Sequence, residues 1–309
     1  MFDLKQYRTT DYGFFGPDSV SWKLWTHPTA VIGFQRAVVL EHFDPALTAA
    51  VADMGGIYED PQQRLDLTLA YFITVATADS KTAIETSEHL MGIHAKATGI
   101  EPITGKRYSA NNPASQLWIH LTGWHSVLKC YEMYGPGLSA EEERRYWAEC
   151  RIAAELQTCD PADVPADRDG VRAYFESVRP SLCVSDRALR GMHYLLRTGG
   201  NANWRLRIAS RLTAPAAIAT LPKWMREMGE FDQPGIVDTG WKLPTRMAVR
   251  ASSNATVGSL VIAPISPLTS KVLRAHRDAG EPAEPVVLTP SQGRDRYGKL
   301  NRRTTSRPA

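Results

Sequence analysis

The sequence has no run of about 18 uninterrupted apolar residues, the length that a helix needs to cross a bilayer, so we expect no membrane-spanning segment. Its first 36 residues also lack the cationic start and apolar core of a secretory signal. Both absences predict a cytoplasmic protein. The cysteines form no CxxC pair, no CxxCH motif and no zinc-ligand spacing. We therefore expect reduced, mostly buried thiols at four positions: Cys130, Cys150, Cys159 and Cys183.

Several catalytic signatures are absent as well. The patterns Gly-x-Ser-x-Gly, Gly-x-Gly-x-x-Gly, His-Glu-x-x-His and the P-loop do not occur, so hydrolase, nucleotide-binding and zinc-peptidase functions have no support. No Glu is followed three residues later by His, which excludes the helical di-iron carboxylate centres that need two such pairs.

Outside its C-terminal end the chain has little net charge. The formal net charge is +3, and residues 294–309 hold six basic residues and one acidic residue, so the first 293 residues have a net charge of about −2. A near-neutral body does not favour nucleic-acid binding, although the basic end could contact phosphate. The content of 43% hydrophobic and 22% charged residues is typical of a large globular domain.

Hydrophobic residues recur at helical spacing from about residue 28 to residue 228, and the alternation typical of strands is scarce. Asp60 before Pro61 predicts a capped helix start, and Ser139 with Glu142 forms the pattern of a capping box. We expect helices at 61–78, 81–98, 113–134, 140–156, 186–197 and 203–219.

These segments predict an all-α fold with one main helical domain at 1–275. Residues 240–268 are apolar enough to return to the core of that domain. Residues 276–309 are rich in Pro, Glu, Arg and Ser, which predicts a polar C-terminal extension without a fixed fold. Nothing in the sequence predicts the oligomeric state.

His94 lies on the apolar side of the predicted helix 81–98, where an imidazole needs a partner. One interpretation is a core histidine bonded to a backbone carbonyl. The other is a metal or haem ligand, because a neutral ring nitrogen in an apolar pocket suits a proximal haem ligand. Both alternatives stay open on spacing alone.

Arg64 and Thr68 lie one turn apart on the predicted helix 61–78. An arginine in so apolar a helix must reach solvent or find an anion, because its charge cannot be removed. The functional alternative pairs Arg64 with a carboxylate or a haem propionate, while Thr68 offers a hydroxyl to bound water or dioxygen.

His120 lies on the apolar face of the predicted helix 113–134 and has the same two interpretations as His94. Trp118 and Trp124 on that helix fit core or pocket walls better than a special aromatic site.

Six segments in order resemble the rubber oxygenase catalytic-domain family, which includes the latex-clearing protein and the oxygenase of mycophenolic acid biosynthesis. The resemblance covers roughly residues 13–230 and rests on the order and gaps of the segments rather than on one motif. The segments are FGPDSVSW (15–22), GFQRAVVLEHFDPALTAAV (33–51), EDPQQRLDLTLAY (59–71), GIHAKATG (92–99), GKRYSANNPASQLWIH (105–120) and GPGLSAEEERRYWAE (135–149).

The resemblance implies a globin-like helical fold and a non-covalent b-type haem, with oxygenase activity that uses dioxygen on an apolar, unsaturated, isoprenoid-like substrate. In this family's pattern His94 corresponds to the proximal iron ligand. Arg64 and Thr68 correspond to catalytic residues on the distal side, and Arg64 would also contact the haem. His120 is assigned either to support of the haem site or to plain structure.

Three positions depart from the pattern. Leu67 stands where the rubber-cleaving branch has a lysine that can occupy the sixth iron position, and Asp44 stands where many relatives have His before Pro. The distal glutamate has two candidates, Glu41 and Glu59. The alternative to an oxygenase is a non-catalytic helical protein that binds haem or another apolar ligand in the same pocket.

Overall fold

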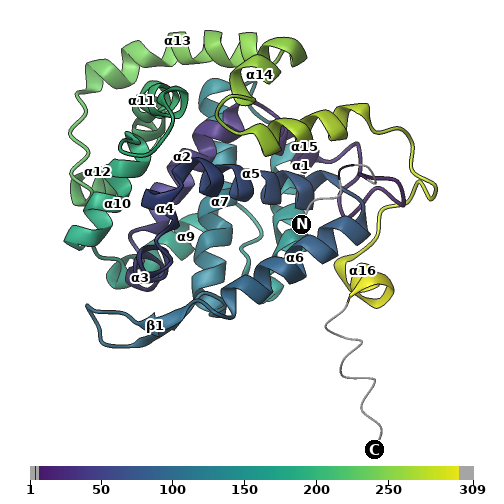
Figure 1. Cartoon of the computed structure of the whole chain (residues 1–309), viewed down its shortest axis with the longest axis horizontal. Coiled ribbons are helices and arrows are strands. Elements are labelled where there is room, and N and C mark those ends of the chain that lie inside the picture. The colour runs from purple at the N-terminus through teal and green to yellow at the C-terminus, as the bar shows by residue number, and fades with distance from the viewer. Residues whose placement is uncertain (1–3, 5–6, 299–309) are drawn as a thin grey trace, which may run out of the picture.

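The computed structural model describes residue 4 and residues 7–298. These residues fold into helices and two short strands (Figure 1), so the predicted all-α fold is confirmed. The α-helices are α1 Val20–Trp25, α2 Thr29–Glu41, α3 Pro45–Asp53, α4 Gly56–Glu59, α5 Pro61–Thr77, α6 Ser80–His94, α7 Pro113–Tyr134, α8 Ala140–Ala154, α9 Arg168–Val178, α10 Asp186–Leu196, α11 Trp204–Ala219, α12 Lys223–Met228, α13 Gly235–Ser252, α14 Ala255–Ile262, α15 Pro267–Asp278 and α16 Pro290–Tyr297. Two 3-10 turns lie at η2 Pro161–Asp163 and η3 Arg179–Ser181, and the strands are β1 Thr98–Ile100 and β2 Arg107–Ser109.

The helix starts have local causes in the sequence. The Asp60 carboxylate accepts a hydrogen bond from the Gln63 amide at the start of α5, and Pro61 occupies the first turn, where a missing N–H costs nothing. At α8, Ser139 and Glu142 form the predicted capping box. The predicted helix 81–98 ends four residues early, at His94, because residues 98–100 instead pair with residues 107–109 as an antiparallel hairpin.

The centre of the molecule is the crossing of α2 and α7. Gly33 allows it, because a Cβ at that position would lie 2.8 Å from the Cα of Val127. Arg36 is buried in the same crossing and donates hydrogen bonds to the Ser126 hydroxyl at 2.7 Å and to the Thr220 carbonyl at 3.3 Å. Its charge is thus solvated by polar groups of the core.

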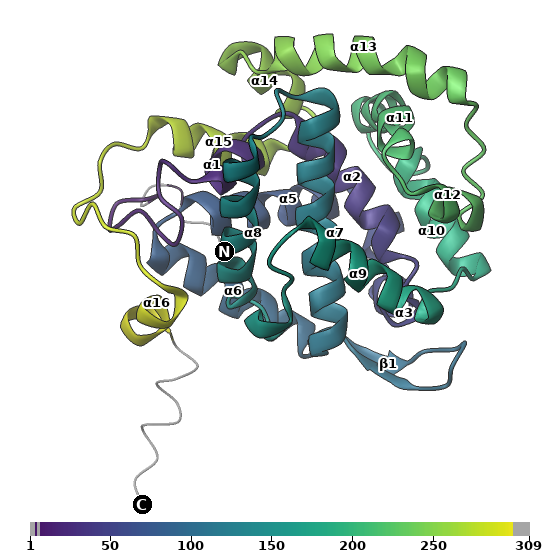
Figure 2. The ribbon, with the colours of Figure 1, turned by 180° about the vertical axis from the view of Figure 1, so that it is seen from behind.

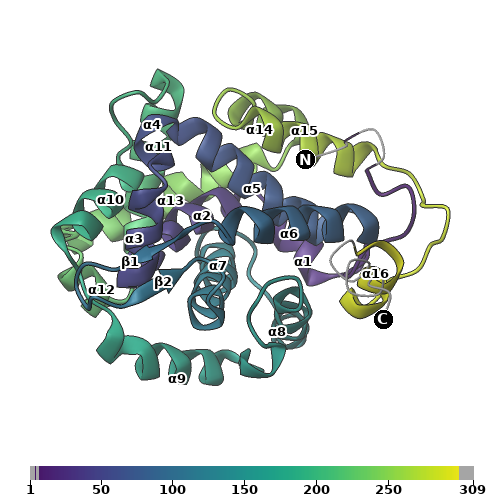
Figure 3. The ribbon, with the colours of Figure 1, turned by 60° about the horizontal axis from the view of Figure 1, so that its bottom comes forward.

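The β1–β2 hairpin packs beside α3 at one edge of the molecule, as Figure 3 shows. Tyr108 on β2 donates a hydrogen bond to the Asp53 carboxylate at 2.6 Å, which joins the hairpin to the end of α3. The four cysteines are free thiols, and all but the half-buried Cys183 are buried.

Helices α13, α14 and α15 return to the main body, as residues 240–268 predict. The buried Asp66 carboxylate on α5 accepts hydrogen bonds from the Ser266 hydroxyl and from the amides of Leu268 and Thr269. This cluster fixes the start of α15 against α5. Helices α13 and α14 form the outermost layer of the molecule in Figure 1 and, seen from behind, in Figure 2.

Part of the predicted C-terminal extension has regular structure. The predicted boundary between residues 275 and 276 falls inside α15, which runs to Asp278. Arg8 stabilises the end of this helix, because it donates hydrogen bonds to the carbonyls of His276 and Ala279. Helix α16 packs against α6, where Gly293 leaves room for the ring of Phe14. Residues 299–309 lie outside the described residues. Within the described part of the chain, no helix is both long and apolar enough to span a membrane.

Candidate functional site

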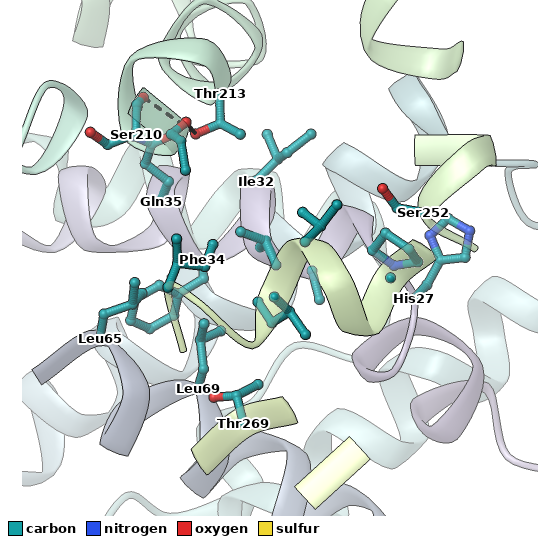
Figure 4. A pocket seen from close by; sticks show the side chains of 18 of the residues that line it. His27, Ile32, Phe34, Gln35, Leu65, Leu69, Ser210, Thr213, Ser252 and Thr269 are labelled. Carbon is teal, nitrogen blue, oxygen red and sulfur yellow. Dashed lines mark hydrogen bonds between the residues drawn. The ribbon is translucent and has the colours of Figure 1, made fainter. Parts of the chain in front are cut away.

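A cavity of about 830 Å³ lies beside α2 and α5 and is enclosed by α11, α13, α14 and α15. Most of its wall is apolar. Residues from His27 before α2 to His42 after it line the cavity, so at 1.5 Å per residue it extends along about 20 Å of helix. Figure 4 shows side chains from both sides of the cavity, among them Ile32 on α2, Leu65 and Leu69 on α5, and Thr213 on α11.

One part of the cavity wall holds a polar group formed by Glu41, His42, Arg64 and Thr68. Burial raises the pKa of Glu41 to about 7, and the positive charge of Arg64 acts in the opposite direction. Among the described residues none forms an ion pair or a hydrogen bond with this carboxyl group. Glu41 is therefore a carboxyl group that changes protonation near neutral pH at the wall of an apolar cavity.

Arg64 is half-buried, and burial lowers its pKa while the charge of Glu41 raises it. No described carboxylate forms a salt bridge with its guanidinium. Its charge acts on Glu41, His42 and His94. Arg64 is thus the electrostatic centre of the group, and its hydrogen-bond donors remain available to an anion.

Thr68 also lines the cavity, one turn after Arg64. Its hydroxyl donates a hydrogen bond to the Arg64 carbonyl at 2.8 Å, which uses its proton inside the helix. The Thr68 oxygen can still accept a hydrogen bond from a bound molecule. Leu67, at the place of the family's lysine, does not line the cavity and is 37% exposed.

His94 is the last residue of α6 and is half-buried. Burial and the charge of Arg64 lower its pKa to about 4, so the ring is neutral at pH 7. Its ring nitrogens have no hydrogen bond to a described residue, which differs from the satisfied core histidine that the sequence also allowed. His94 is not among the residues that line the cavity; its link to the cavity wall is the charge of Arg64.

The structure places His120 elsewhere. It is fully buried between α7 and α8, where Nε2 donates a hydrogen bond to the Cys150 carbonyl at 2.7 Å, and it does not line the cavity. Burial lowers its pKa to about 4, so it is neutral at pH 7. These contacts match the structural interpretation of His120.

Of the two glutamates considered for the distal side, only Glu41 lines the cavity. Glu59 is exposed at the end of α4. Sequence reasoning missed the opposite wall, which includes Ser210 and Thr213 on α11 and Ser252 on α13. The one available signal was the apolar character of residues 240–268, which indicates burial but not what is buried.

A haem-binding protein needs only one axial side chain for the iron, and the neutral, unbonded ring of His94 suits that role. The unpaired guanidinium of Arg64 suits a carboxylate such as a haem propionate. Among the described residues no group of three or more His, Cys, Asp or Glu could hold a metal ion through protein ligands alone. The residues present therefore fit a haem better than a metal ion bound only by side chains.

Comparison with protein families gives one match, over residues 22–254: the ER-bound oxygenase mpaB/B′ and rubber oxygenase catalytic domain. No curated protein and no solved structure gives a significant match. The matched segment includes α2, α5 and α6, which hold Glu41, Arg64 and His94, together with α11 and α13 from the opposite wall. Because the match covers well over half of the chain, this protein belongs to the family of ER-bound oxygenase mpaB/B′ and rubber oxygenase catalytic domains.

Proposed function

We propose that the protein is a b-type haem-dependent oxygenase that uses dioxygen to oxidise an apolar, unsaturated small molecule of isoprenoid type. The observation that supports this most is the apolar cavity whose wall holds Glu41, Arg64 and Thr68, with the neutral ring of His94 coupled to Arg64. The family match supports the oxygenase class.

In this proposal His94 would hold the haem iron through a ring nitrogen, and Arg64 would pair with a propionate or with negative charge that develops nearby. The haem, when bound, supplies the redox chemistry with dioxygen. Because Leu67 replaces the family's lysine, this position would supply no ligand to the iron.

The other residues act on the substrate. The apolar wall binds a hydrophobic chain and excludes water, so a charge on Glu41 or Arg64 acts with little screening. Glu41 can accept or donate a proton near neutral pH, because its pKa is close to 7. Arg64 stabilises negative charge on oxygen, and Thr68 can accept a hydrogen bond that orients a polar group.

The test is an absorption spectrum of protein expressed with ample haem, recorded oxidised, reduced, and reduced with carbon monoxide. We expect a Soret band that shifts on reduction and again with carbon monoxide. The His94→Ala variant should lose the haem, while His89→Ala should keep it, because His89 is an exposed histidine on the same helix.

Full haem content in His94→Ala would contradict the assignment of the ligand. A colourless wild-type protein that also fails to take up added haem would contradict the haem proposal. Binding of an apolar ligand by that colourless protein would then favour the non-catalytic alternative.

A further inference from the structure

Large hydrophobic side chains are exposed unevenly over the molecule. Nine of the seventeen in the described chain belong to three helices, α11, α13 and α14. Two of the nine, Ile236 and Leu260, are 82% and 72% exposed. Exposed apolar side chains that are grouped in this way mark an interaction surface, whereas single scattered ones do not. We call the nine together the outer apolar face: Trp204, Ile208, Leu212, Ile236, Leu243, Met247, Val257, Leu260 and Val261.

The spacing of these residues makes stripes. Trp204, Ile208 and Leu212 follow one another at every fourth residue along α11, so they share one side of that helix. On α13, Leu243 and Met247 are one turn apart, while Thr245 and Val249 are buried on the opposite side. Because α13 and α14 form the outermost layer in Figure 1 and Figure 2, no other described element covers the outer side of that layer.

The charge on the same helices is almost entirely positive, because Asp238 at the start of α13 is the only acidic residue on them. No acidic residue occurs from residue 187 to 226 or from residue 239 to 277. Six exposed basic residues accompany the apolar stripes, and none forms an ion pair with a described residue: Arg205, Arg207, Arg211, Lys242, Arg246 and Arg250. Asp238 is paired with Arg226 on α12.

The outer apolar face continues into the cavity. Leu212 and Val261 belong to the face and also line the cavity. Pro244 on α13, which is exposed next to Leu243, lines the cavity too. Apolar side chains therefore connect the outer apolar face with the cavity wall.

We propose that the outer apolar face docks on the surface of a bilayer that contains anionic lipids. Exposed Trp, Ile, Leu and Met side chains enter the boundary of the acyl chains, and the flanking Arg and Lys side chains contact the anionic headgroups. A lipid surface fits better than a folded partner because it is both apolar and uniformly anionic, while this face is apolar and its three helices hold a single acidic residue, Asp238, which is paired with Arg226. Direct entry of an apolar substrate from the bilayer into the cavity follows as well, and this second step alone rests on the proposed function.

The experiment is co-sedimentation of the full chain with vesicles of phosphatidylcholine alone and of phosphatidylcholine with phosphatidylglycerol. We expect binding to the anionic vesicles that weakens as salt is added, because salt screens the headgroup charge. The double variant Leu243→Glu/Met247→Glu should lose binding by at least about tenfold. Arg250→Glu should weaken binding by about fivefold or more and leave a weaker salt dependence.

The matched controls lie on the β1–β2 hairpin and its turn. Ile100→Glu/Ile103→Glu places the same change at exposed apolar residues far from the face, and Lys106→Glu reverses an exposed cation there. Both should bind vesicles like wild type. Circular dichroism and thermal unfolding establish that all variants are folded, and haem content distinguishes a failure of docking from a failure of the oxygenase proposal.

Three results would overturn the proposal: no binding to either vesicle, equal binding of Leu243→Glu/Met247→Glu and wild type, or equal loss in the hairpin controls. A dimer in gel filtration that the α13 variant abolishes, without vesicle binding by wild type, would assign the face to a second copy instead.

Discussion

Glu41 combines a carboxyl group, an apolar cavity wall and a neighbouring cation. Its raised pKa means that the folded protein binds this proton more tightly than the unfolded chain does. The stability associated with Glu41 is therefore fully present below its ordinary pKa of 4.5 and is lost as the pH rises to about 7. Above that pH the buried carboxylate destabilises the fold.

We predict that Glu41→Gln stabilises the protein at pH 8 by on the order of 2 to 3 kcal/mol, because it removes a buried negative charge. At pH 5 the difference should be much smaller, since the wild-type group is then protonated. Urea unfolding at both pH values measures this. Glu59→Gln is the control, because Glu59 is exposed. The same stabilisation at pH 5 and pH 8 would contradict the assignment.

Arg64 shows how one residue can join parts of a site that do not touch. It lines the cavity with Glu41, and its charge acts on His94, which does not line the cavity. A single-residue pattern cannot reveal this. The pairing depends on α2 and α6 both lying within reach of the start of α5.

At the scale of elements, the crossing of α2 and α7 determines where the cavity wall stands. The two helices approach closely at Gly33, and residues on both sides of Gly33 along α2 line the cavity. A side chain at the crossing would push α2 away from α7 and toward the cavity.

We predict that Gly33→Ala destabilises the protein by about 1 to 3 kcal/mol, since its Cβ would lie 2.8 Å from the backbone of Val127. Gly123→Ala on α7 is the matched control, because a Cβ there meets no atom within 4 Å. That change should be neutral or stabilising by up to about 1 kcal/mol through helix propensity. Denaturant unfolding of both variants measures the contrast. Equal effects would show that the crossing is not tightly packed at Gly33.

At the scale of the whole molecule, the cavity lies between an inner wall of α2 and α5 and an outer cover of α11, α13, α14 and α15. The cover is held by a few polar clusters, such as that of Asp66 with Ser266 and Thr269. Access for a ligand therefore depends on residues of the cover that face both solvent and cavity.

We predict that Ala248→Trp lowers the affinity for a large apolar ligand by at least about tenfold, because a bulky ring on α13 occupies the cavity. Ala251→Trp is the control: Ala251 is also exposed on α13 but does not line the cavity. Neither change should lower the unfolding temperature much, since both positions are exposed. Titration with a fluorescent fatty acid measures binding, and equal loss in both variants would show that the effect is not one of cavity volume.

The sequence by itself determined the features that depend on neighbours within one or two helical turns. The capped starts at Asp60 and Ser139, the helical period and the all-α class follow from short-range chemistry, as does the family, whose motifs lie within short segments. The error at the end of α6 arose where residues 98–100 pair with partners seven to eleven residues further along rather than with the previous turn.

Only the tertiary structure decided what surrounds the site. It separated His120, bonded to Cys150, from Arg64, and it selected Glu41 rather than Glu59 as the carboxyl group of the cavity. It also brought α15 onto α5, through contacts between residues 200 positions apart in the chain. Such contacts depend on how the apolar faces of helices far apart in the sequence pack into one core. No short-range pattern in the sequence indicates this packing.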